Sequence, residues 1–141
     1  MNQDAEGTVT AYYAALRDGE SLSAFFREAP DTVTVGLSER QVGYADVAAE
    51  LSEQTATTVD WTVESHDLSV SADGDTAWFS DLVTLGWTDS KLDTDYSFET
   101  RWTGTLTRRD RSEPWQFVVL HVSVANEELR TAEDDLFAWE G

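Results

Sequence analysis

The sequence has 141 residues, a length that suits a single domain. Its 28 acidic residues against 9 basic ones give a formal net charge of −19, which excludes ordinary nucleic-acid binding because phosphates need a cationic surface. Cysteine is absent, so disulfides and thiolate chemistry are excluded as well.

The first third of the chain shows helical periodicity. Val9, Tyr12, Tyr13 and Leu16 follow the i, i+3, i+4, i+7 spacing of an amphipathic helix, which we predict from Ala5 to Arg17. A short second helix is expected over residues 21–29 before Pro30. After a strand in "DTVTVGL", the stretch "GYADVAAELSEQTA" predicts a third helix.

The rest of the chain reads as long strands. We predict four runs, with a tight "ADGD" turn between the first two, and these runs are Val59–Ser71, Thr76–Trp87, Thr94–Thr107 and Trp115–Ala125. Helices followed by such strands indicate an α+β fold. We expect a cone in which three N-terminal helices pack on a strongly curved antiparallel sheet, with a pocket at the wide end.

The chain divides into a domain over residues 1–126 and an acidic tail over residues 127–141. A helix is one interpretation of the tail, in which Leu136, Phe137 and Trp139 are candidate docking residues. No apolar run approaches the roughly 20 residues that a membrane span needs.

The last two predicted strands bring polar side chains together. Pairing them through a loop centred near Arg111 places Arg101 opposite His121 and Glu99 opposite Ser123. An arginine beside a histidine suits anion binding, because the guanidinium group stays charged and donates in a planar fork. We therefore expect a polar patch on one face of the sheet.

The first hairpin yields a second pair. In the expected register Asp81 lies opposite His66, within an otherwise apolar row. The pair has two interpretations, a structural cross-strand contact or a general acid–base pair. No G-x-S-x-G turn supports nucleophilic catalysis by Ser123, and the spacing of histidines and carboxylates indicates neither a zinc nor a calcium site.

The acidic surface also bears on the environment of the protein. Lysine occurs once, at Lys91, and a surface of Asp and Glu with so little Lys is typical of salt-loving microbes. The start "MNQDAEGTVTAYY" lacks the basic and apolar regions of a signal peptide. We expect a cytoplasmic protein from a high-salt organism.

Several segments resemble the NTF2-like superfamily and, within it, the SnoaL-like domains. They are "AYYAALRDGESLSAFF", "VTVGLSERQVGYADVAAEL", "TAWFSDLVTL" and "RWTGTLTRRDRSEPWQFVVLHVSVA". In the last segment Arg101, Thr103, Trp115, His121 and Ser123 fill the positions of an Arg-x-Thr, hairpin, Trp and His-x-Ser pattern. The same ending is similar to the association domain of calmodulin-dependent kinase II.

The resemblance implies a cone-shaped barrel that dimerises through its sheet and holds a small ligand. Steroid isomerases of the family carry a base carboxylate near the position of Thr34, Val35 and Gly36, and this sequence has none there. Ligand-binding residues are then expected at Arg101, His121, Trp87, Tyr13, Glu99 and Ser123. The catalytic candidates are Asp81, His66 and His121.

Three functions stay open from the sequence. The first is a homodimeric module that binds a small molecule, anions included, in its cone without a cofactor. The second is an isomerase, cyclase or dehydratase type of enzyme. The third is a dimerisation scaffold without catalysis, and fold analogy alone does not choose among them.

Overall fold

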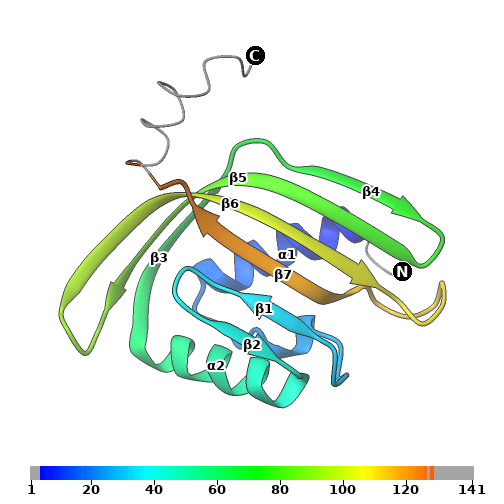
Figure 1. Cartoon of the computed structure of the whole chain (residues 1–141), viewed down its shortest axis with the longest axis horizontal. Helices are drawn as coiled ribbons and strands as arrows, with labels where there is room; N and C mark the ends of the chain where they lie inside the picture. Colours follow the sequence, from blue (N-terminus) through cyan, green and yellow to red (C-terminus); the bar gives the residue numbers. More distant parts are fainter. Residues whose placement is uncertain (1–3, 127, 129–141) are drawn as a thin grey trace.

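The computed structural model describes residues 4–126 and Glu128 (Figure 1). The acidic tail predicted from residue 127, with Leu136, Phe137 and Trp139, lies outside the described residues, Glu128 excepted. None of the helices in the described part is long and apolar enough to cross a membrane.

The first helix, α1, spans Ala5–Arg17 as its periodicity predicts. The Asp4 carboxylate caps it by accepting a hydrogen bond of 2.7 Å from the backbone N–H of Gly7. The apolar stripe of α1, including Val9 and Leu16, is buried against the sheet. Burial of this stripe, more than the propensity of its residues, stabilises a helix of this length.

The described part of the chain has two α-helices, and the prediction of three is wrong. The helix that was predicted second, before Pro30, does not form. Residues Ser23–Phe25 form only a 3-10 turn, η1. The chain then extends at Phe26, which bridges Phe117, and the Arg27 N–H donates to the Phe117 carbonyl at 3.0 Å. Pairing with the sheet thus ends the turn early. The second α-helix, α2, spans Tyr44–Thr57.

Seven strands form one sheet in the order β2-β1-β7-β6-β5-β3, with β4 also paired to β5. They are β1 (Val33–Val35), β2 (Arg40–Val42), β3 (Thr58–Ser65), β4 (Ser69–Asp73), β5 (Thr76–Asp89), β6 (Thr94–Thr107) and β7 (Gln116–Val124). The sheet is curved, with α1 behind it and α2 along the β1–β2 side in Figure 1.

Two features of the sheet differ from the prediction. The single run predicted over Val59–Ser71 is two strands, β3 and β4, which both pair with β5. The sheet is mixed, because β1 runs parallel to β7. Sequence reasoning joined strands through hairpins, and a hairpin makes only antiparallel neighbours.

The two faces of the sheet differ in character. The inner face, which packs against α1, carries alternating buried side chains along β5, among them Phe79, Val83 and Leu85. Gly104 on β6 permits the close packing of this face, because a Cβ there would lie 2.6 Å from Cε1 of Phe79. The outer face points away from the helices.

Candidate functional site

A pocket of about 320 Å³ opens between α2, the β1–β2 turn and the inner face of the sheet. We call it the cone pocket, after the pocket that the sequence analysis expects in the cone. Its lining residues are Tyr12, Leu16, Gly36, Leu37, Ser38, Glu39, Glu50, Glu53, Gln54, Thr57, Thr58, Trp61, Leu85, Trp87, Asp89, Trp102, Leu120 and Val122.

Three tryptophans, Trp61, Trp87 and Trp102, line the pocket together with Tyr12. A β-bulge in β3 lies between Val59 and Thr62, with Asp60 at a φ of 57°. Asp tolerates this left-handed conformation better than most residues, and the bulge changes the direction of the following side chain, Trp61. The ring of Trp61 stacks on Trp87 with a centroid distance of 5.0 Å.

The wall tryptophans are fixed by hydrogen bonds as well as by stacking. Trp61 donates from Nε1 to Thr58 Oγ1 at 2.9 Å. Trp102 donates from Nε1 to Thr100 Oγ1 at 2.9 Å, and Thr100 donates in turn to the Val83 carbonyl at 2.6 Å. Rings held in this way give the pocket a preformed apolar wall.

Two carboxyl groups meet on the opposite side of the pocket. Burial raises the pKa of Glu50, and the charge of Glu39, a hydrogen bond with Glu39 and the charge of Glu53 raise it further. Gly36 leaves room for this arrangement, because a Cβ there would lie 3.3 Å from Oε1 of Glu39. Glu50 therefore holds its proton more readily than an isolated glutamate does.

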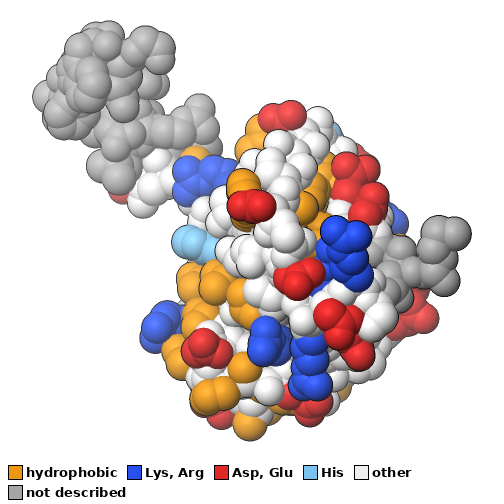
Figure 2. Space-filling view, turned by 90° about the vertical axis from the view of Figure 1, so that its right-hand side faces the viewer, with side chains coloured by type: hydrophobic (Ala, Val, Ile, Leu, Met, Phe, Trp, Pro, Cys, Tyr) orange, Lys and Arg blue, Asp and Glu red, His pale blue; other side chains and the backbone are white. Residues whose placement is uncertain are grey.

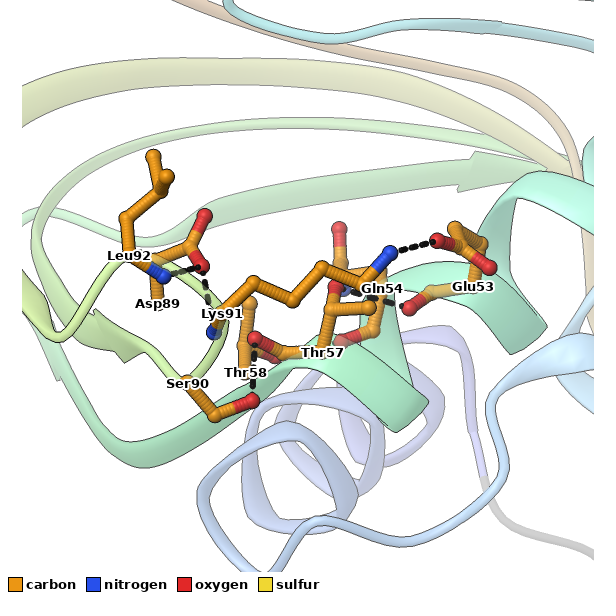
Figure 3. A network of polar contacts seen from close by, with 8 residues as sticks. All are labelled: Glu53, Gln54, Thr57, Thr58, Asp89, Ser90, Lys91 and Leu92. Carbon is orange, nitrogen blue, oxygen red and sulfur yellow. Dashed lines mark hydrogen bonds and ion pairs between the residues drawn. The ribbon is translucent and has the colours of Figure 1, made fainter.

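Hydrogen bonds connect the end of α2 to the β5–β6 turn at one edge of the pocket (Figure 3). Ser90 donates from Oγ to the Thr57 carbonyl at 2.9 Å, and its N–H donates to the same carbonyl. Lys91 forms an ion pair of 3.2 Å with Glu53. Both side chains are more than half exposed, so the ion pair adds at most about 1 kcal/mol of stability.

The charge of the pocket is one-sided. Its lining includes four acidic residues, Glu39, Glu50, Glu53 and Asp89, and no Lys, Arg or His. Like charges that line a cleft set the local potential and repel ligands of the same sign. The sequence analysis allowed an anionic ligand in the cone. The acidic lining disfavours such a ligand in this pocket.

The structure places the predicted polar patch on the outer face of the sheet, away from the pocket. Arg101 lies opposite Ser123, and His121 lies opposite Thr103, so the predicted pairing of Arg101 with His121 is wrong by two residues. A bulge in β7 at Val118 adds one residue to the hairpin, and the loop is centred later than expected. A shift of two residues preserves the face.

Arg101 forms two hydrogen bonds on that outer face. Its Nε donates to Ser123 Oγ at 3.2 Å and its Nη2 to the Val124 carbonyl at 3.2 Å. Both Arg101 and His121 are exposed, and neither lines the pocket. The inner face is instead taken by the even-numbered residues of β6, including Trp102, because these apolar side chains pack against α1.

The predicted Asp81–His66 pair is also wrong. Asp81 is buried, and its carboxylate accepts hydrogen bonds from Tyr13 Oη (2.8 Å), Ser65 Oγ (2.6 Å) and the Asp67 N–H (2.9 Å). Tyr13 is likewise buried and is not part of the pocket wall. Helix α1, the last residue of β3 and the loop after β3 thus supply the donors to Asp81, in place of His66.

His66 and Glu99 meet on the outer face instead. Thr84 donates from Oγ1 to Oε1 of Glu99 at 2.7 Å and lies 2.7 Å from Nε2 of His66. Because the threonine proton goes to Glu99, Thr84 accepts from a protonated Nε2 of His66. All three side chains are at or near the surface, and none of them lines the cone pocket.

Trp87 is the one predicted ligand-binding residue that lines the pocket. Sequence reasoning missed Glu39, Glu50 and Trp61. Glu50 could have been noticed in the sequence, because it lies beside the apolar residue Leu51 in the predicted helix. Nothing in the local sequence pattern indicates that Glu39 approaches Glu50. No group of three or more metal-ligating side chains occurs among the described residues.

No curated protein matches this sequence significantly. The family of SnoaL-like domains matches residues 6–127. The chain belongs to this SnoaL-like family. The match covers both helices, the sheet and the pocket described above, and it confirms the resemblance seen in the sequence.

Solved structures confirm that the SnoaL-like chain has the NTF2-like fold. One is a Streptomyces avermitilis protein of the NTF2-like family, provisionally named a dehydratase, with 19% identity, a TM-score of 0.73, and coverage of 86% of this chain and 93% of that one. Another, from Xanthomonas campestris, is provisionally a calcium/calmodulin-dependent protein kinase II association domain, with 20% identity, a TM-score of 0.69 and coverage of 86% of both chains.

A third similar structure is from Novosphingobium aromaticivorans and is provisionally named a scytalone dehydratase. It has 15% identity and a TM-score of 0.72, and the likeness covers 86% of this SnoaL-like chain and 81% of that one. At such identities the comparison shows the fold, and the chemistry must be argued from the site.

Proposed function

We propose that this SnoaL-like chain binds a small, largely apolar molecule, uncharged or cationic, in the pocket of its cone. The observation that carries the proposal is the lining of that pocket. It combines three fixed tryptophans with four acidic residues and has no basic side chain. Small-molecule sites are typically concave and apolar with a few polar groups that orient the ligand.

Three naphthalenes of matched shape test this proposal: uncharged 2-naphthol, anionic 2-naphthoate and cationic 2-naphthylmethylamine. Calorimetric titration is expected to show binding of the naphthol and the amine, and weaker or no binding of the carboxylate. Trp87→Leu should weaken binding. Trp78→Leu is the matched control, because Trp78 is 49% exposed and lies outside the cone pocket. Tightest binding of the naphthoate would contradict the proposal.

A second candidate function is acid–base catalysis by the Glu39–Glu50 pair. In the dehydration of a β-hydroxy ketone, a carboxylate takes the proton next to the carbonyl while a carboxylic acid protonates the hydroxyl, which leaves as water. Two carboxyl groups with separated pKa values can divide these roles. The raised pKa of Glu50 suits the acid, and Glu39, which forms a hydrogen bond with Glu50, is the candidate base by its position. Similar structures that are provisionally named dehydratases make this reaction class the one to test first.

The test follows the dehydration of 4-hydroxy-4-phenyl-2-butanone by the absorbance of its conjugated product. The rate is expected to fall as pH rises through the pKa of Glu50, and Glu50→Gln should abolish it. Asp89→Asn is the control, because Asp89 also lines the pocket but is not among the groups that raise the pKa of Glu50. A rate equal to that in buffer at every pH would contradict catalysis of this class.

Self-association through the outer face is a further part of the proposal. The centre of this face carries no acidic residue in a chain that has 28 of them, although Trp78, Leu82 and Val119 are 49%, 50% and 38% exposed. Its members are Ser69, Ser71, Trp78, Ser80, Leu82, Arg101, Thr103, Thr105, Val119, His121 and Ser123. Depletion of charge around exposed apolar residues is typical of the core of an interface.

Sedimentation velocity tests this association at low and at multimolar KCl. Dimers are expected at high salt, because salt screens the repulsion between two chains of charge −19. Leu82→Asp should give monomers. Leu92→Asp is the matched control, since Leu92 is 65% exposed in the β5–β6 turn, away from the outer-face centre. A monomer under both salt conditions would contradict the proposal.

A further inference from the structure

A small pocket of about 140 Å³ lies between the β6–β7 hairpin and the segment that follows η1. It is at the end of the sheet opposite the β5–β6 turn (Figure 1). Figure 2 faces this end of the molecule, where several basic side chains stand among acidic ones. The lining consists of Arg27, Thr107, Arg108, Arg109, Glu113, Pro114 and Gln116.

The charge of this pocket is the reverse of that of the chain. Three of the nine basic residues line it, against one acidic residue, Glu113. Guanidinium groups repel one another at short range, so their convergence costs free energy unless an anion lies among them. The cone pocket, in contrast, is lined by no basic residue at all.

Arg108 is held in a fixed position. Its Nε donates to Asp75 Oδ1 at 2.9 Å, its Nη2 donates to the Gly74 carbonyl at 3.4 Å, and its guanidinium carbon lies 4.5 Å from the ring centre of Trp115. A guanidinium group has five N–H donors, so Arg108 keeps others beyond these two bonds. A side chain fixed in advance loses little conformational entropy when it binds a ligand.

The other two arginines complete the pocket from separate segments. Arg27 donates from Nη1 to Thr107 Oγ1 at 3.2 Å, which directs its guanidinium group toward the hairpin. Arg109 is exposed beside it. Among the acidic groups nearby, Asp75 binds Arg108 from outside the pocket lining, and the Asp110 carboxylate accepts hydrogen bonds from Ser112.

We propose that this pocket binds a phosphate group, either free or as the end of a phosphate ester. Arginines that line one pocket from three positions suit an oxyanion with several oxygens, and arginine recognises phosphate through paired N–H donors. The volume is several times the roughly 30 Å³ share of a water molecule, which accommodates a phosphate group. This site is separate from the cone pocket and does not depend on the function proposed there.

Calorimetric titration with inorganic phosphate, phenyl phosphate and acetate tests the site at one fixed KCl concentration that keeps the chain folded. Both phosphates are expected to bind, and acetate to bind at least about tenfold more weakly, since it offers two oxygens. Arg109→Gln and Arg27→Gln should each weaken phosphate binding by about tenfold. Arg40→Gln is the matched control, because Arg40 is exposed on β2 and does not line the pocket.

Circular dichroism of each variant shows whether a loss of binding is caused by a loss of folding. Substitution of Arg109 is the less disruptive of the two, because Arg109 is exposed. The proposal is overturned if neither phosphate binds the folded chain, because the three arginines then form a self-compensated ion cluster with Glu113 and Asp75. It is also overturned if acetate binds as tightly as phosphate, or if Arg109→Gln binds phosphate like Arg40→Gln. Binding of inorganic phosphate without phenyl phosphate would restrict the site to the free ion and supports the proposal in that form.

Discussion

The hydroxyl of Tyr13 on α1 donates a hydrogen bond of 2.8 Å to Oδ2 of Asp81 on β5, in the buried layer between helix and sheet. A buried carboxylate is costly unless its oxygens are hydrogen-bonded, and here Ser65 and the Asp67 N–H complete the set. This network fixes α1 on the inner face of the sheet. Tyr13 and Asp81, which the sequence analysis considered as site residues, therefore stabilise the fold.

Tyr13→Phe is expected to lower the free energy of unfolding by about 1.5–3 kcal/mol, the usual cost of removing a hydrogen bond to a charged group. Urea denaturation monitored by circular dichroism measures the change. Tyr12→Phe is the control on the same helix, because Tyr12 borders the cone pocket and has no such carboxylate partner. Equal losses for the two variants would refute the special role of the Tyr13–Asp81 bond.

Glu50→Gln is expected to stabilise the fold near neutral pH. The pKa of Glu50 is raised in the folded chain, so the folded state holds its proton more tightly than the unfolded state does. Its contribution to stability is therefore complete below the ordinary glutamate pKa and is lost as pH rises through the raised folded value. Exposure and screening keep the gain from the amide below about 1 kcal/mol.

The pH dependence makes this second prediction specific. The advantage of Glu50→Gln over the unchanged chain should shrink as pH falls through the raised pKa, because the folded state then takes up the Glu50 proton. It reaches its smallest value below the ordinary glutamate pKa, where Glu50 is protonated in both states. Denaturation midpoints at neutral and at mildly acidic pH measure the difference. An advantage that stays constant over this range would show that burial and Glu39 do not perturb Glu50 as described.

Gly104→Ala is expected to destabilise the chain by about 1–3 kcal/mol, the cost of inserting a methyl group into a well-packed core. The added Cβ would lie 2.6 Å from Cε1 of Phe79 and 2.8 Å from the Val119 carbonyl oxygen. Thermal unfolding measures the loss. A second variant with Phe79→Leu should recover part of it, because the leucine side chain vacates the position of the ring. Additive losses in the double variant would contradict the clash.

Salt is expected to raise the stability of the whole chain. A net charge of −19 repels itself in dilute buffer, and the Debye length falls from about 10 Å at 0.1 M to about 3 Å at 1 M salt. Urea midpoints at 0.1 M and 2 M KCl should therefore differ, with the higher value at 2 M. Similar midpoints would argue against a protein adapted to high salt.

The secondary structure was largely predictable because local patterns dictate it. Periodicity defined α1, and the tight turn at Gly74 with its φ of 63° appeared where "ADGD" indicated it. The register was less predictable, because a bulge at Val118 adds a residue that no local signal announces. The short strand β2 and the parallel pairing of β1 were missed for a related reason, since both depend on contacts between distant segments.

The candidate site was harder to predict than the fold. Alternation indicated that Arg101 and His121 share one face, and this is confirmed. The face of β6 that packs against the helices is set by Trp102 and Leu106, which are buried. Their burial places the polar residues of the same strand on the other face, whatever chemistry those residues could perform. The Glu39–Glu50 pair joins a turn to a helix, and no spacing rule predicts such a contact.

Helix α2 ends at Thr57 and strand β3 begins at Thr58, so no loop separates them. A junction without spare residues couples the orientation of the helix to the position of Trp61 in the wall of the cone. For the ligand binding proposed above, a larger guest would then have to be accommodated by the facing turn at residues 36–39, whose side chains are mostly exposed. Substitutions in that turn are therefore the ones expected to change the size of molecule that the cone admits.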